Sequence, residues 1–72
     1  MTSGTEKIKE NLKINIKKYR KSLKWTQYEL SIQADVTHDH IQFIETGRRM
    51  PSLHVLGKIA DALKVEPYEL LK

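Results

Sequence analysis

The stretch TQYELSIQADVTHDHIQFIETG holds two short amphipathic segments, one on each side of ADVT, and this pair most constrains how the chain can fold. Thr26 opens the first segment, and Thr26-x-x-Glu29 is a capping box, in which each side chain bonds the other residue's backbone N–H. Thr37 opens the second segment and is expected to cap it. Each segment makes only about two helical turns, too few to persist in isolation. The pattern therefore predicts two helices that depend on being locked together.

The corner between the two segments is the next constraint. A tight turn between helices usually needs a residue at positive φ, which glycine adopts best and which asparagine or aspartate tolerates. Asp35 is expected to take this conformation, with Val36 as an apolar plug behind it. Gly47 stands just after Thr46, where the second helix should end in a left-handed cap. Two capped helices joined in this way predict a helix-turn-helix, whose second helix is presented to the major groove of DNA.

Three further amphipathic helices are predicted around this pair. The first begins near Lys7 and ends between Ser22 and Lys24. Ser52 is expected to cap the next helix, and Pro67 takes the first position of a short last helix, where no N–H is needed. The apolar residues expected to face the core are Ile8, Leu12, Ile16, Tyr19, Leu23, Leu30, Ala34, Val36, Ile41, Ile44, Leu53, Leu56, Ile59, Ala60, Leu63 and Leu70, with Ile32 and Leu71 as further candidates.

The sequence predicts one all-α domain. A chain of 72 residues allows one domain at most, and no β-strand pattern competes with the helices. Residues 1–6 are expected to be a frayed N-terminal arm, and residues 7–72 the domain. Because the chain has no cysteine, disulfides and cysteine-ligated zinc are excluded. Stability must then come from helix packing or from a partner.

Charge is distributed unevenly along the chain, whose formal net charge is +4. Residues 1–24 carry eight basic and two acidic side chains, whereas residues 25–72 carry five basic and seven acidic ones. A strongly basic half suggests a polyanionic partner. A lysine-rich helix face in solvent would give the same counts, so charge alone leaves both interpretations open.

Several classes of protein do not match the sequence. No apolar run approaches the roughly 18 residues of a membrane span, and no signal-peptide region follows the start, so we expect a cytoplasmic protein without a membrane partner. No nucleophile–base–orienter set and no phosphate-cradling glycine loop is visible, so we expect neither an enzyme nor a cofactor. His38 and His40 point to different sides of a helix, which argues against a metal site. No small-molecule ligand is predicted.

Four motifs together resemble those of the Xre/Cro/CI-like helix-turn-helix domains of phage repressors and bacterial regulators. They are TQYEL, then I-x-x-I-E-x-G-x-R-x-P-S from Ile41 to Ser52, then KIADAL and V-x-P-x-E-L-L. The resemblance covers roughly residues 8–71. It implies a five-helix lambda-repressor-like fold, with the helix-turn-helix at helices 2 and 3. It also implies a bacterial or phage-encoded protein that is associated with the nucleoid.

The resemblance assigns roles to individual side chains. The outward positions of the third helix, which would read base edges, are His38, Asp39, Gln42 and Phe43. The positions that would bind DNA phosphates are Gln27, His40, Thr46, Arg48, Arg49 and Ser52. Gln27 would also brace the first residue of the third helix. Arg20 and Glu45 match a structural pair that links the first helix to the third. Because the family often dimerises through its last helices, Tyr68 and Leu71 are candidates for a homodimer contact.

The chain departs from the family pattern at the corner, where Asp35 replaces glycine, and on the reading face. Asp39 can only accept hydrogen bonds, so cytosine N4 is its best partner. Phe43 cannot hydrogen-bond, which leaves a thymine methyl contact or a place in the core.

Our first hypothesis is a sequence-specific double-stranded DNA-binding transcriptional regulator, a small dimeric repressor or controller. The alternative, motivated by Asp39 and Phe43, is a protein-interaction module of the same fold, such as an antitoxin-like partner-binding protein.

Overall fold

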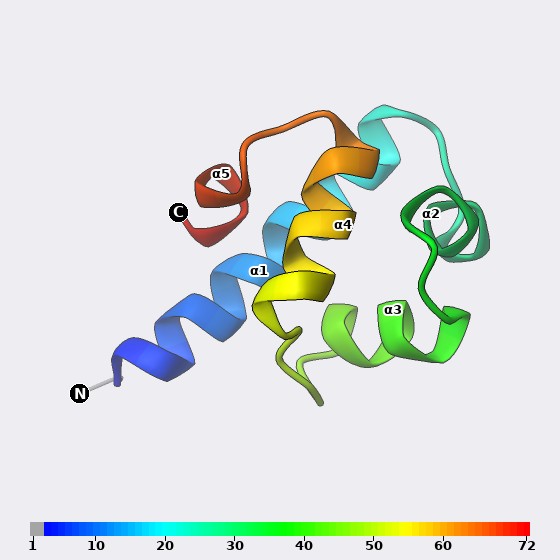
Figure 1. Ribbon diagram of the computed structural model, residues 1–72. Helices are drawn as coiled ribbons and strands as arrows, with labels where there is room; N and C mark the ends of the chain where they lie inside the picture. Colours follow the sequence, from blue (N-terminus) through cyan, green and yellow to red (C-terminus); the bar gives the residue numbers. More distant parts are fainter. Residues whose placement is uncertain (1–2) are drawn as a thin grey trace.

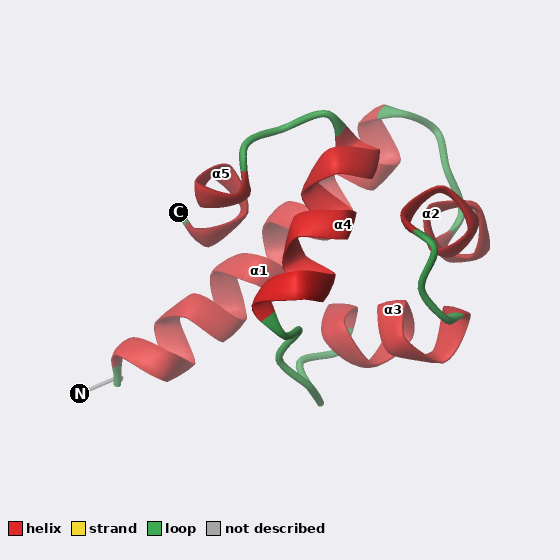
Figure 2. Cartoon of the chain, viewed as in Figure 1, coloured by secondary structure: helices red, strands yellow, loops and turns green. Residues whose placement is uncertain are grey.

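The computed structural model describes residues 3–72, which form five helices and no strand (Figure 1, Figure 2). The helices are α1 (Gly4–Ser22), α2 (Gln27–Ala34), α3 (His38–Glu45), α4 (Leu53–Leu63) and α5 (Pro67–Leu71). The predicted all-α, five-helix fold is therefore confirmed. None of the helices in residues 3–72 is long and apolar enough to cross a membrane.

The first helix begins earlier than the sequence suggested. α1 starts at Gly4 rather than near Lys7, because the hydroxyl of Ser3 accepts a hydrogen bond from the Glu6 N–H at 3.1 Å and caps the helix. The part of the expected N-terminal arm that the structure describes thus belongs to the cap and first turn of α1. Met1 and Thr2, the rest of that arm, lie outside the described residues.

The corner between α2 and α3 has the predicted chemistry. Both hydrogen bonds of the capping box form, since Thr26 Oγ1 accepts from the Glu29 N–H at 3.0 Å and Glu29 Oε1 accepts from the Thr26 N–H at 2.9 Å. Asp35 ends α2 in the left-handed conformation, with φ 56° and ψ 48°. Thr37 caps α3 by accepting from the His40 N–H. Local sequence signals therefore set both ends of the turn.

The core lies between all five helices. Its buried apolar side chains are Leu12, Ile16, Leu30, Ala34, Ile41, Ile44, Leu56, Ile59, Ala60, Leu63 and Leu70. Four expected core positions are wrong, and two of them, Ile8 near the start of α1 and Leu23 just after its end, are each 39% exposed. Ile32 is 60% exposed, because it lies on the face of α2 opposite Leu30 and Ala34. Leu53 is 87% exposed at the first position of α4.

Two asparagines of α1 hold the short last helix in place. Asn11 Nδ2 donates to the Leu71 carbonyl and Asn15 Nδ2 donates to the Leu70 carbonyl, both at 3.1 Å. The last carbonyls of a helix lack partners within the helix, so these side chains satisfy groups that would otherwise need water. The Leu70 side chain is fully buried, and Leu71 is half-buried against the core. A five-residue helix is thereby fixed to a long one.

The left-handed residue that ends α4 gives a test of backbone strain. Lys64 has φ 62°. A left-handed conformation costs an L-residue roughly 1–2 kcal/mol that glycine avoids, so we expect Lys64→Gly to raise the free energy of unfolding by about 1 kcal/mol. Lys18→Gly makes the same change at an exposed site inside α1 and should lower it by about 1 kcal/mol. Urea denaturation measures both, and a destabilised Lys64→Gly variant would contradict the explanation.

Candidate nucleic-acid interface

The third helix has one face packed against the protein and one face open. Ile41 and Ile44 are buried in the core, and α3 packs against both α1 and α2. His38, Asp39 and Gln42 are exposed on the other face. Gln42 follows Asp39 by three residues and His38 by four, so it is the neighbour of both on one helical surface. Three of the four expected base-reading side chains are thus free to meet a ligand.

The fourth expected reader, Phe43, is placed differently. Its side chain is half-buried, and its ring centroid lies 5.3 Å from the Cζ atom of Arg49. The ring therefore has a guanidinium over one face. His40, expected near the DNA backbone, is also half-buried. The sequence pattern gave Phe43 two possible places, the core or the reading face, and the structure puts it at the edge between them.

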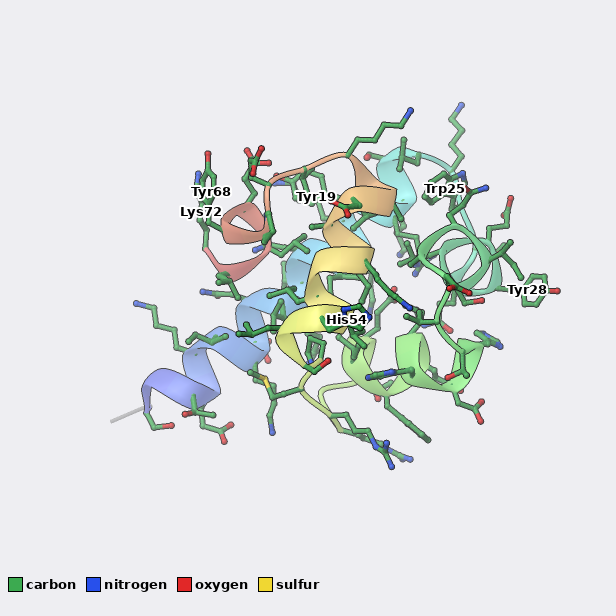
Figure 3. All side chains as sticks on the ribbon, in the orientation of Figure 1. Tyr19, Trp25, Tyr28, His54, Tyr68 and Lys72 are labelled. Carbon is green, nitrogen blue, oxygen red and sulfur yellow. The ribbon has the colours of Figure 1, made fainter. Side chains whose placement is uncertain are left out.

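An aromatic contact supports the first residue of α3. The rings of Tyr28 and His38 meet edge to face, with their centroids 6.1 Å apart and their planes at 87°. Tyr28 is exposed on α2 and points outward at the side of the molecule (Figure 3). The sequence analysis missed this residue and gave Gln27 the bracing role instead. Aromatic rings prefer such edge-to-face arrangements, so the contact with Tyr28 favours this orientation of the His38 ring.

Gln27 contacts the other end of α3. Its Nε2 donates to Glu45 Oε1 at 3.2 Å. The same carboxylate accepts two hydrogen bonds from Arg20, from Nε at 2.8 Å and from Nη2 at 2.9 Å. Arg20 Nη1 donates to the Trp25 carbonyl at 2.8 Å. This two-point ion pair between α1 and α3 is the contact that the family resemblance implied for Arg20 and Glu45.

The ion pair is buried and fully satisfied. The Glu45 side chain is 1% exposed and that of Arg20 is 10% exposed. In residues 3–72, no buried side-chain nitrogen or oxygen lacks a hydrogen-bond partner. Two charges out of water are stable only with such complete pairing. The pair therefore fixes the position of α3 relative to α1 without leaving a buried charge unmatched.

A basic loop follows α3. Gly47 takes φ 78°, which turns the chain back after Thr46 ends the helix. Arg48 and Arg49 are exposed, and within residues 3–72 no carboxylate lies at ion-pair distance from either. The Thr46 hydroxyl donates to the Gln42 carbonyl at 2.9 Å. Thr46 would have to break this bond before it could donate to a phosphate.

Lys13 of α1 lies beside the same loop, although the sequence analysis did not single it out. Its Cδ atom is 3.7 Å from the position that a Cβ would occupy on Gly47. Its ammonium is 3.5 Å from Glu10, in a partly exposed pair of the kind that is worth little in water. Many lysines share α1, so only the folded structure could show which one reaches the loop.

The first turn of α4 completes this edge of the molecule. Ser52 Oγ accepts from the Val55 N–H at 3.1 Å. Figure 1 shows α3, the loop that follows it and the start of α4 along one edge of the molecule. This edge combines an exposed polar helix face, two arginines and the positive end of a helix dipole. The part of the chain that the structure describes holds no group of three possible metal ligands.

Comparisons with known proteins agree with this geometry. A family model described as helix-turn-helix matches residues 16–70. The crystal structure of a hypothetical transcription factor, NHTF from Neisseria, is 29% identical over 90% of this chain and 73% of its own, with a TM-score of 0.87. That of the restriction-modification controller protein C.AhdI from Aeromonas hydrophila is 26% identical over 92% of this chain and 97% of its own, with a TM-score of 0.81. No curated protein sequence matches the chain.

The buried ion pair yields a stability test. Arg20→Met and Glu45→Leu should each lower the free energy of unfolding by about 3–5 kcal/mol, because each strands the opposite charge in the interior. The double variant should lose clearly less free energy of unfolding than the two single variants together, because neither charge remains in the interior. Glu10→Gln, which breaks an exposed pair, is the control and should cost less than about 1 kcal/mol. Chemical denaturation measures all four variants, and strictly additive losses for Arg20 and Glu45 would show that the two do not act as a pair.

Proposed function

The chain belongs to the helix-turn-helix family, and we propose that it is a transcriptional regulator that binds specific double-stranded DNA sequences with α3 in the major groove. Its family and two similar solved structures, a hypothetical transcription factor and a restriction-modification controller protein, support a DNA-binding regulator rather than an enzyme. The observation that carries the proposal is the exposed polar face of α3, held rigidly from behind and bordered by two arginines without carboxylate partners in residues 3–72.

The proposed reading of bases rests on three side chains. Gln42 suits adenine, to which an amide can donate and accept in the major groove. Asp39 accepts only, which suits the N4 amino group of cytosine. His38, whose ring meets that of Tyr28 edge to face, would present one donor or acceptor at the amino end of α3. A short face of this kind reads only a few base pairs.

The phosphate contacts would come from the edge around α3. Arg48, Arg49 and Lys13 supply positive charge, and the start of α4 supplies backbone N–H groups. Contacts of this type set affinity and register without reading sequence. A protein that binds bacterial or phage DNA in this way would work in the cytoplasm, at the nucleoid.

The decisive experiment is selection of bound duplexes from a random DNA pool, followed by binding titrations over a range of salt. We expect an enriched motif, and we expect Arg48→Gln and Arg49→Gln each to reduce the slope of log affinity against log salt by about 0.9. His38→Ala should instead weaken the base preference at one position of the enriched DNA motif. Lys64→Gln removes the same charge at the far end of α4 and should leave the slope unchanged. A pool without enrichment would contradict the proposal and favour the protein-interaction alternative.

We also propose that the protein binds as a homodimer through α5. Tyr68 is 57% exposed on a helix that α1 holds firmly. Leu71 supports the proposal less, because its side chain already packs against the core of its own chain. Two copies with reading helices one turn of DNA apart, about 34 Å, would recognise a two-fold symmetric site.

The dimer proposal predicts a concentration-dependent mass in analytical ultracentrifugation. Tyr68→Glu should shift the protein toward monomer, because it places a charge in an apolar contact. Ile32→Glu introduces the same group at a comparably exposed apolar site on α2 and should leave the mass unchanged. A monomer mass at every concentration, with and without DNA, would rule out the dimer.

A further inference from the structure

We propose that Phe43 does not read a base but positions Arg49 for a DNA phosphate. The inference deepens the proposed function and rests on it, because it explains how a neighbouring ring positions one arginine for its phosphate contact. It also departs from the expectation that the resemblance placed on this position.

The backbone after α3 folds back onto Phe43. The N–H groups of Arg48 and Arg49 both donate to the Phe43 carbonyl, at 2.8 and 3.2 Å. Gly47 permits this turn because its φ of 78° strains any residue with a side chain. These bonds hold the Arg49 backbone next to Phe43, so the Arg49 side chain starts within reach of the Phe43 ring.

The guanidinium of Arg49 then lies over that ring. The distance of 5.3 Å between Cζ and the ring centroid is within the range of a cation–π contact. Phe43 is half-buried, in contrast to the exposed His38, Asp39 and Gln42. A ring that is partly enclosed and covered by a cation has little surface left for a thymine methyl. The pairing accounts for an apolar residue at the border of a polar face.

The contact prepares Arg49 for a phosphate. A free arginine loses much rotamer freedom when it binds, and a side chain held in advance loses less. A phenylalanine side chain has no hydrogen-bond acceptor, so the contact with the ring leaves the guanidinium N–H groups available for a bidentate bond to a phosphate. No carboxylate of residues 3–72 competes for these groups at ion-pair distance. Phe43 would thus raise affinity for every DNA sequence equally, since phosphate contacts carry no sequence information.

The test compares Phe43→Leu, Phe43→Tyr, Arg49→Gln and the double variant Phe43→Leu/Arg49→Gln. Affinity is measured on the selected duplex and on duplexes with single base-pair changes. Phe43→Leu should weaken binding about two- to fivefold on all duplexes alike, and Phe43→Tyr should retain wild-type affinity because it keeps the ring. In the Arg49→Gln background, Phe43→Leu should have no further effect. Thermal unfolding of each variant controls for loss of structure.

Two results would overturn the inference while leaving the proposed function intact. One is a double variant whose loss of DNA affinity equals the sum of the losses from Phe43→Leu and Arg49→Gln alone. The other is a change of preference at one base pair in Phe43→Leu, which would make Phe43 a base reader. If the wild-type protein bound no duplex even at low salt, both proposals would fall together.

A measurement without DNA tests the contact itself. In the NMR spectrum of the free protein, the Arg49 side-chain protons should be shifted upfield by the ring. The shift should persist in Phe43→Tyr and disappear in Phe43→Leu. Unshifted protons in the wild type would show that the ring does not hold Arg49.

Discussion

A buried ion pair between Arg20 and Glu45 is the contact on which the position of α3 depends. The pair joins the last turn of α1 to the last residue of α3. Glu45 also accepts a hydrogen bond from the Gln27 amide, and Arg20 also donates to the Trp25 carbonyl. The carboxylate is thus surrounded by donors from two other helices. An eight-residue helix has little stability of its own. It can present an open face only because its buried face and its end are fixed to the rest of the chain.

The sequence predicted those features that depend on neighbouring residues. The capping box of Thr26 and Glu29, the cap at Thr37, and the left-handed residues Asp35 and Gly47 are all set by local backbone chemistry. A capping side chain reaches only a few residues along the chain, so its pattern is visible in the sequence. These signals were enough to place both helices of the motif and the turn between them.

Apart from the local Ser3 cap at the start of α1, the features that sequence reasoning missed depend on which side chains meet in space. The Tyr28–His38 contact, the approach of Lys13 to Gly47, and the Arg49 guanidinium above Phe43 all join different elements or a helix and its loop. Helical periodicity tells which residues share a face, but not where a neighbouring helix ends. Leu53 shows the difference, because it continues the apolar stripe of α4 and yet its side chain is exposed. Only the packed structure sets that limit.

The proposed interface therefore has two kinds of surface, one on helix α3 and one on the loop that follows it. His38, Asp39 and Gln42 lie on a helix whose orientation the ion pair fixes, so their hydrogen-bonding groups have defined directions. Arg48 and Arg49 lie on the loop after α3, where their charges suit phosphates, which differ little from one DNA sequence to another. Asp39 strengthens this division, because a carboxylate is repelled by phosphate and gains only where a base offers a donor. In the proposed mode of binding, the helix would discriminate between sequences and the loop would supply affinity for all of them.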